Sequence, residues 1–285
     1  MSDDRAPDWT IPVMRAGYSA RGIVYTILGG LTLAAAMRGG QTEGTQGALA
    51  TLRDSGWGIA LLWIIALGLL CYGVWREIAA YYDLEHRGDD EEGLAKRLGL
   101  VVTGIIHMGM AVAVAALAMG RGGSGGEDGA QDWTGKLMAL PAGKWLVAIA
   151  AIAIAGAGVH YILKGWKKKY QRYIRVTEVS RKLSPVLRWG FVSYGIILVI
   201  IGVFLGIAAL QSDPSEAKGF GDALAYIRDQ SYGGFLLGLF GLGILGFAIE
   251  NFVEARYRVV PGVRDAGNLE TLASRAKAKA RAAAS

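Results

Sequence analysis

Three related stretches decide the fold of this chain: RAGYSARGI at 15–23, RLGLVVTGI at 97–105 and RWGFVSYGI at 188–196. All three follow the pattern Arg-x-Gly-x-x-x-x-Gly-Ile, and each one opens a long apolar segment. A motif that returns at intervals of roughly 80 to 90 residues indicates that one structural unit occurs three times along the chain.

Six apolar segments are long enough to span a bilayer, which takes about 20 residues of helix. Three of them, Trp57 to Trp75, Trp189 to Leu210 and Tyr232 to Ile249, contain no charged residue. A spanning segment must satisfy its backbone hydrogen bonds internally, so all six are predicted to be helices. The predicted fold is therefore all-α: a polytopic integral membrane protein with six transmembrane helices, arranged as three two-helix repeats with a pseudo-threefold relation. We expect the spans at about 17–37, 57–77, 98–119, 144–164, 189–210 and 232–254.

Each predicted repeat contains a short connecting segment between its two spans. The first connector, Gly47-Ala-Leu49-x-x-Leu52, has counterparts that begin at Gly135 and Asp222. Apolar residues three positions apart share one face of a helix, which predicts a short amphipathic helix at the membrane interface. The first span begins like a cleaved signal peptide, but because it matches the third and fifth spans we expect it to be retained. The predicted units are an N-terminal segment at 1–12, repeats at 13–80, 94–166 and 187–257, and a basic tail at 258–285.

Small residues follow the repeated motif along each odd-numbered span. Seven residues after the second motif glycine stand Gly29, Ala111 and Gly202, two helical turns further along the same face. Smooth faces of this kind let neighbouring backbones approach closely, which is how membrane helices commonly associate. The residues predicted to pack helices together are Gly22, Gly29, Gly104, Gly195, Gly202 and Gly206.

The distribution of positive charge predicts the orientation in the membrane. The chain has a formal net charge of +6, and most of its 30 Lys and Arg residues lie near the termini and in the loops 81–96 and 164–188. The positive-inside rule therefore places both termini in the cytoplasm, with the protein in a bacterial plasma (inner) membrane. The basic clusters favour anionic lipid headgroups as partners rather than nucleic acid. The predicted headgroup contacts are Lys167, Lys168, Lys169 and Arg172.

The three Arg-x-Gly starts, the repeated connectors and the sequence GLLCYG at 68–73 together resemble a known family. The chain is similar to the bacterial membrane proteins grouped as domain of unknown function twelve-oh-six. The resemblance implies three two-helix repeats in the membrane, and no activity or functional residue that can be carried over. The middle repeat departs most from the pattern, with a glycine-rich insert at 120–126.

The ionisable residues singled out within the predicted spans are Arg21, His107, His160 and Glu250. Such residues face the bundle interior, a water-filled cavity or the interface, because exposure of a charge to lipid is costly. Arg21 and Glu250 both fall in the predicted cytoplasmic half. There they either pair with each other or lie separately, Arg21 by extending to the interface and Glu250 as an interfacial carboxylate.

The two histidines allow three interpretations. Histidines on neighbouring helices are suited to binding haem or to relaying protons. In the repeat alignment, however, His107 stands where the first repeat has Tyr25, and His160 stands where the other repeats have Tyr72 and Phe247. The favoured interpretation is therefore a polar ring that packs in place of an aromatic one.

The sequence contains no recognisable catalytic, cofactor-binding or metal-binding motif. We therefore expect a protein that is not an enzyme and that has no cofactor and no metal. Internally repeated spans favour a channel or transporter for a small solute or ion, with a path near the intramembrane ionisable residues. The alternative is a structural or partner-binding membrane subunit without transport activity, associated with a second copy or with another membrane protein.

Overall fold

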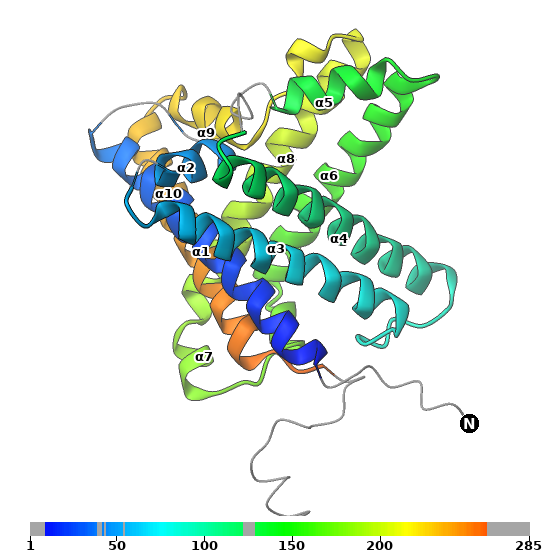
Figure 1. Ribbon diagram of the computed structural model, residues 1–285, viewed down its shortest axis with the longest axis vertical. Helices are drawn as coiled ribbons and strands as arrows, with labels where there is room; N and C mark the ends of the chain where they lie inside the picture. The colour runs from blue at the N-terminus through cyan, green and yellow to red at the C-terminus, as the bar shows by residue number, and fades with distance from the viewer. Residues whose placement is uncertain (1–8, 39–41, 43, 54, 122–128, 261–285) are drawn as a thin grey trace, which may run out of the picture.

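The structure is a computed structural model that describes residues 9–38, 42, 44–53, 55–121 and 129–260. Within this part of the chain, six helices are long and apolar enough to cross a membrane (Figure 1). The prediction of an all-α protein with six transmembrane helices is confirmed, and the chain is a multi-pass membrane protein. The six spans are α1 (Thr10–Arg38), α3 (Gly58–Tyr81), α4 (Glu91–Ala118), α6 (Gly143–Trp166), α8 (Ser184–Gln211) and α10 (Gly233–Tyr257).

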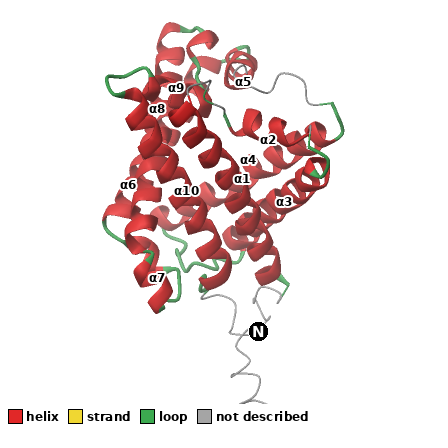
Figure 2. Cartoon of the chain, turned by 90° about the vertical axis from the view of Figure 1, so that its left-hand side faces the viewer, coloured by secondary structure: helices red, strands yellow, loops and turns green. Residues whose placement is uncertain are grey.

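Shorter helices lie at both ends of the bundle. Each repeat has a connector helix between its two spans: α2 (Thr45–Arg53), α5 (Gly129–Met138) and α9 (Phe220–Arg228). The loop between α6 and α8 holds η1 (Lys169–Arg172) and α7 (Glu178–Lys182), and η2 (Pro214–Glu216) precedes α9. We call the end with α2, α5 and α9 the connector end. The opposite end, where α1 begins and α10 ends, is the terminal end (Figure 2).

The outer surface of the bundle is apolar, as a membrane protein requires. Each span contains a stretch of 18 residues with a mean hydropathy between 1.4 and 2.6. On α3, Ile64 is 57% exposed and Leu67 is 59% exposed, and large apolar side chains are likewise exposed on α4 and α6. Such a surface would drive aggregation in water, whereas the hydrocarbon of a bilayer solvates it.

The second span of each repeat begins at a glycine that lies against the preceding connector helix. A Cβ atom at this glycine would overlap a backbone carbonyl in the last turn of the connector, so a larger residue would push the connector away. The turn is therefore built in the same way in all three repeats. The glycines and the residues whose carbonyls they face are Gly58 and Leu52, Gly143 and Leu137, and Gly233 and Arg228.

The six spans form a ring with one opening. Helix α1 packs against α3 and α10, α4 packs against α3, and α8 packs against α6 and α10. Among the described helices, α4 and α6 are not in extensive contact, and Figure 2 shows α6 and α3 on opposite sides of α1 and α10. In their most apolar stretches, 22% of residues are buried in α4 and 17% in α6, against 61% in α10. The middle repeat is therefore splayed, and the pseudo-threefold arrangement is broken there.

The first glycine of the repeated motif gives a local reason for this break. A Cβ atom at Gly17 would lie 2.6 Å from the backbone nitrogen of Tyr72, and one at Gly190 would lie 2.5 Å from the carbonyl carbon of Gly246. In repeats 1 and 3 the two spans touch closely because these positions lack a side chain. A Cβ atom at Gly99, the counterpart in repeat 2, would meet no described atom within 4 Å.

The predicted packing glycines lie mostly at helix contacts. Gly195 of α8 faces Gly158 of α6, where a Cβ atom would lie 2.6 Å from the carbonyl oxygen of Gly158. The prediction that Gly206 packs against another helix is wrong, because a Cβ atom there would meet no described atom within 4 Å. It lines a groove of about 430 Å³ between α6 and α8, which diverge toward the connector end. The remaining four also face an atom of another element closer than 3.0 Å: Gly22, Gly29, Gly104 and Gly202.

Candidate functional site

Arg21 is buried near the middle of α1, with 4% of its surface exposed. Its Nη1 donates a hydrogen bond of 2.7 Å to the hydroxyl oxygen of Tyr72 on α3. The guanidinium carbon lies 4.5 Å from the ring centroid of Tyr72, 5.6 Å from that of Tyr25 and 5.7 Å from that of Phe247. Aromatic ring faces attract a cation. These rings therefore stabilise the Arg21 charge inside the bundle.

Aromatic rings from several helices meet around Arg21. Tyr25 of α1 donates a hydrogen bond of 3.0 Å to the hydroxyl of Tyr194 on α8. Tyr194 stacks on Phe247 of α10 with 4.1 Å between ring centroids, and Tyr161 of α6 meets Tyr194 edge-on at 5.1 Å. Such pairs add to the free energy gained by burying the rings. At the level of Arg21 the aromatic cluster thus joins all three repeats.

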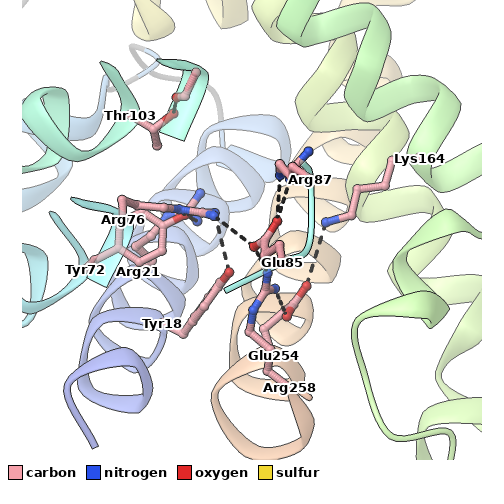
Figure 3. A network of polar contacts seen from close by, with 11 residues as sticks. Tyr18, Arg21, Tyr72, Arg76, Glu85, Arg87, Thr103, Lys164, Glu254 and Arg258 are labelled. Carbon is pink, nitrogen blue, oxygen red and sulfur yellow. Dashed lines mark hydrogen bonds and ion pairs between the residues drawn. The ribbon is translucent and has the colours of Figure 1, made fainter. Parts of the chain in front are cut away.

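A second guanidinium reaches the same Tyr72 hydroxyl. Arg76, one turn further along α3, donates to it through Nε at 2.9 Å and also through Nη2. The Nη2 atom also lies 3.4 Å from the hydroxyl oxygen of Tyr18 on α1. Figure 3 shows Arg21 and Arg76 close together beside Tyr72. Two like charges held together in a buried site need a compensating negative charge, and Glu85 lies 3.8 Å from Arg76 Nη1.

Glu85 is the centre of an ionic network at the terminal end (Figure 3). It lies in the loop between α3 and α4, its side chain is 4% exposed, and its carboxylate pairs with Arg87 at 2.5 Å and with Arg258. Arg258 also pairs with Glu254, whose other oxygen lies 3.7 Å from Nζ of Lys164 on α6. The network therefore joins the ends of α3, α6 and α10, one helix from each repeat.

Charge pairing keeps Glu85 ionised although it is buried. Burial acts to raise the pKa of its carboxyl, but the charges of Arg258, Arg76 and Arg87 outweigh burial and lower that pKa to about 2. Burial acts to lower the pKa of Arg258, yet Glu254, Tyr18 and Glu85 together outweigh it and hold that pKa well above its ordinary value. Glu85 and Arg258 are both charged at neutral pH.

Backbone hydrogen bonds fix the position of Arg258. Its chain segment pairs with the loop after α6, where Ile174 and Arg258 form an isolated antiparallel bridge. The backbone N–H of Arg175 donates to the carbonyl of Tyr257 at 2.7 Å. This pairing holds the chain after α10 beside the loop after α6, where the Arg258 side chain meets Glu85 from the loop after α3 and Glu254 from α10.

The structure buries Arg21 and Glu250 alike, each with 4% of its surface exposed. Within the described residues, however, no ion pair of 4.0 Å or less links them. Arg21 is bonded to Tyr72 instead. Glu250 lies one turn before Glu254 on α10, which puts the two carboxylates on one helix face.

The structure does not bring the two histidines together, because α4 and α6 are not in extensive contact. Nδ1 of His107 lies 2.8 Å from the carbonyl oxygen of Thr103, and the ring of His107 lies 4.5 Å from that of Tyr72. His160 is exposed. The side chain of α6 that packs in the aromatic cluster is that of the next residue, Tyr161. Each residue turns a helix by about 100°, so neighbouring positions face different ways. Aligning His160 with Tyr72 and Phe247 was therefore wrong about which side chain faces the interior.

The basic residues after α6 lie on the surface at the terminal end. Lys167, Lys168 and Lys169 are exposed, and Trp166 beside them is 68% exposed. An exposed tryptophan flanked by lysines is typical of the headgroup layer. The side chain of Arg172, the fourth predicted headgroup contact, lies outside the described part of the structure.

Most of the ionic network was not predicted from the sequence. Arg76 directly follows the uncharged stretch of the second span, so it falls at the edge of that segment. Glu254 and Arg258 are four residues apart and share a helix face, a spacing that does indicate an ion pair. In the sequence Arg258 also reads as the first residue of the basic tail, which hides this signal. The network residues missed are Arg76, Glu85, Arg87, Lys164, Glu254 and Arg258.

Comparison with known proteins settles the family. A family model described as Domain of Unknown Function (DUF1206) matches residues 16–83, 98–168 and 189–258, which make up more than half of the chain. The chain belongs to the DUF1206 family. The three matched DUF1206 segments fall on the three structural repeats, which confirms the resemblance inferred from the sequence.

One curated protein is similar to the chain over most of its length. The DUF1206 chain is 27% identical over 254 residues to Uncharacterized protein YxxB of Bacillus subtilis (strain 168). The aligned region covers 88% of this chain and 92% of that protein. No solved structure matches the chain.

Proposed function

We propose that this DUF1206 protein is a channel or transporter for a small solute or ion, and not an enzyme. The observation that carries the proposal is the buried set of charged side chains that extends from Arg21, in the middle of α1, to Arg258 at the terminal end. Ionisable groups inside a membrane bundle are costly, and those that face the interior commonly mark a substrate or ion pathway.

The repeat architecture supports this proposal. Repeated transmembrane units commonly place a binding site where the repeats meet. The surroundings of Arg21 come from all three units, with Tyr72 from repeat 1, Tyr161 from repeat 2 and Phe247 from repeat 3. In the proposed mechanism the solute or ion binds at Arg21 in the interior of the bundle. The ionic network around Glu85 is the closed gate between that site and the terminal end.

The proposed orientation has the terminal end in the cytoplasm and the protein in the bacterial plasma (inner) membrane. The exposed Lys167, Lys168 and Lys169 at this end support it, because lysines flank spans preferentially on the cytoplasmic side. Their proposed partners are anionic lipid headgroups, which attract a basic residue near the surface by about 1 kcal/mol each.

The test is flux through the pure protein reconstituted into liposomes. Dyes for protons, for monovalent cations and for halide or nitrate report which species crosses the bilayer. Arg21→Gln should lower the flux by about tenfold or more if the buried guanidinium belongs to the path. The matched control is Arg15→Gln on the same helix, because Arg15 is exposed. Flux equal to that of empty liposomes would refute the proposal.

A second candidate function is a partner-binding membrane subunit. The observation in its favour is the splayed middle repeat, where Gly99, Gly109 and Gly156 are not covered by any described atom within 4 Å of an added Cβ. Uncovered small residues accept a further membrane helix, from a second copy or another protein. Cross-linking in native membranes from cysteines placed at Gly109 and Gly156 tests this, and a strong cross-link combined with absent flux would favour the subunit.

A further inference from the structure

The Tyr72 hydroxyl is the point where two positive side chains of the interior converge. Arg21 donates to it through Nη1 at 2.7 Å and Arg76 donates through Nε at 2.9 Å. Arg76 Nη2 makes a further contact with the same oxygen. A phenol oxygen has two lone pairs, so these donors exceed what a neutral hydroxyl accepts. Donors from two guanidiniums that converge on one point are typical of a site for an anionic oxygen.

Carboxylates are fewer than cations around these two guanidiniums, and Glu250, which is buried on α10, makes no described ion pair with Arg21. Glu85 lies 3.8 Å from Arg76, but it is shared with two further arginines. Glu254 is likewise shared between a lysine and an arginine. Among the described ion pairs none includes Arg21. The buried cluster therefore holds more cationic groups than paired carboxylates, and its field attracts an anion.

One edge of the Arg21 guanidinium is unused. Its Nε is buried and has no hydrogen-bond partner in the described part of the chain, where the guanidinium bonds through Nη1. A buried donor left without a partner is costly. The Nε and Nη2 groups of an arginine present parallel N–H donors that bind a carboxylate or a similar planar oxyanion at two points.

We infer that Arg21 and Arg76 form a binding site for a small, planar, monovalent oxyanion such as nitrate or formate. The rings around Arg21 favour a singly charged, weakly hydrated ion, because they cannot replace the water shell of sulfate or phosphate. Two oxygens of the anion meet the unused edge of Arg21, and its charge offsets that of Arg76. That this anion is also the transported species rests on the proposed function.

Binding is tested separately from flux. Thermal unfolding of the full chain in detergent is followed while sodium nitrate or sodium formate replaces sodium chloride at constant ionic strength, because sulfate would stabilise any folded protein. Nitrate and formate should raise the midpoint temperature of the wild type and of Arg15→Gln, and not that of Arg21→Gln. Arg21→Lys keeps the charge but lacks the parallel donors, so its affinity for nitrate should fall by about tenfold. This variant also replaces Arg21→Gln if the latter does not fold.

Tyr72 gives an independent readout that a purely structural Arg21 would not produce. Tyr72→Phe removes the oxygen that the two guanidiniums share, so the shift caused by nitrate should increase. Tyr81→Phe on the same helix is the matched control, because Tyr81 is 77% exposed and lies outside the site. A wild type without an anion-dependent shift, or an Arg21→Gln variant that keeps the full shift, overturns the inference. An Arg21-dependent shift without any flux supports the site and refutes transport, whereas flux without a shift refutes the site alone.

Discussion

Arg258 and Glu85 lie 173 positions apart in the sequence and form an ion pair at the terminal end of the bundle. Arg258 follows the last span of repeat 3, and Glu85 follows the last span of repeat 1. Both side chains are at least 95% buried, with 5% and 4% exposed. The pair ties repeat 1 to repeat 3 at the terminal end.

Glu85 should be more important for stability than any exposed acidic residue. In Glu85→Gln, Arg258 and Arg76 lose a buried counter-charge, and we expect the free energy of unfolding to fall by about 3 kcal/mol. The control is Glu92→Gln, since the Glu92 side chain is 75% exposed and pairs with Lys96 one turn away. Chemical unfolding in detergent measures both variants, and equal losses would contradict the buried network.

The lowered pKa of Glu85 predicts a specific loss of stability in acid. Its pKa is about 2 in the folded protein, against an ordinary value of 4.5. A carboxyl with a lowered folded pKa stabilises the protein above its unfolded pKa, and this contribution is lost as the pH falls toward the folded pKa. Between about pH 5 and pH 2 the wild type should therefore lose roughly 3 kcal/mol more than Glu85→Gln does. Parallel pH curves for the two proteins would argue against it.

The contact between α6 and α8 should not tolerate a methyl group at Gly195. A Cβ atom there would lie 2.6 Å from the carbonyl oxygen of Gly158, so the helices must separate. We expect Gly195→Ala to lower the free energy of unfolding by about 2 kcal/mol. Gly206→Ala on the same helix meets open space and should leave it unchanged. Thermal melts of the two variants distinguish the sites. Because alanine favours a helix over glycine, a Gly195→Ala variant as stable as Gly206→Ala would contradict the close contact.

Tyr161 and His160 are neighbours in the sequence that should differ strongly in their effect. Tyr161 packs against Tyr194 and Phe247 inside the bundle, whereas His160 is exposed. Tyr161→Ala should cost about 3 kcal/mol of stability, and His160→Ala should cost little. Unfolding in detergent provides the comparison. A larger effect at His160 would restore the original alignment of the fourth span.

The proposed orientation predicts which surface cysteines a membrane-impermeant maleimide can reach. In a Cys71→Ser background, Lys182→Cys at the terminal end should react only after the cells are lysed. Ser231→Cys at the connector end should react in intact cells, because both positions are exposed and only the bilayer separates them. If Lys182→Cys reacts in intact cells and Ser231→Cys reacts only after lysis, the terminal end lies outside the cytoplasm and the proposed orientation is wrong.

The number and type of the helices were predictable because each depends on a local property of the chain. Transfer of a segment into lipid depends on its own composition and length, so hydropathy identified the span that contains Arg21 as well as the three apolar segments without a charge. Arg21 and Glu250 could be singled out for the same reason, since a charge within an apolar stretch is visible in the sequence, but whether they are buried or reach the interface was left open.

Partner choice was not predictable, because it depends on how the helices are ordered around the ring. The sequence suggested Arg21 with Glu250, whereas the structure joins Arg21 to Tyr72 and Glu85 to Arg258. Loop lengths and repeat symmetry do not reveal that α4 and α6 are splayed, and the repeated motif reads the same at Gly99 as at Gly17. Only contact with a neighbouring backbone distinguishes the two glycines.

By itself, the sequence determined that this protein spans a membrane six times in three repeats, because lipid solvation and repeat periodicity are properties of the chain alone. The tertiary structure decided which charges meet, which rings surround Arg21 and which repeat departs from the symmetry. Those outcomes depend on side chains from distant segments that reach the same small volume. Their energies depend on burial and distance, and neither quantity exists until the helices have packed.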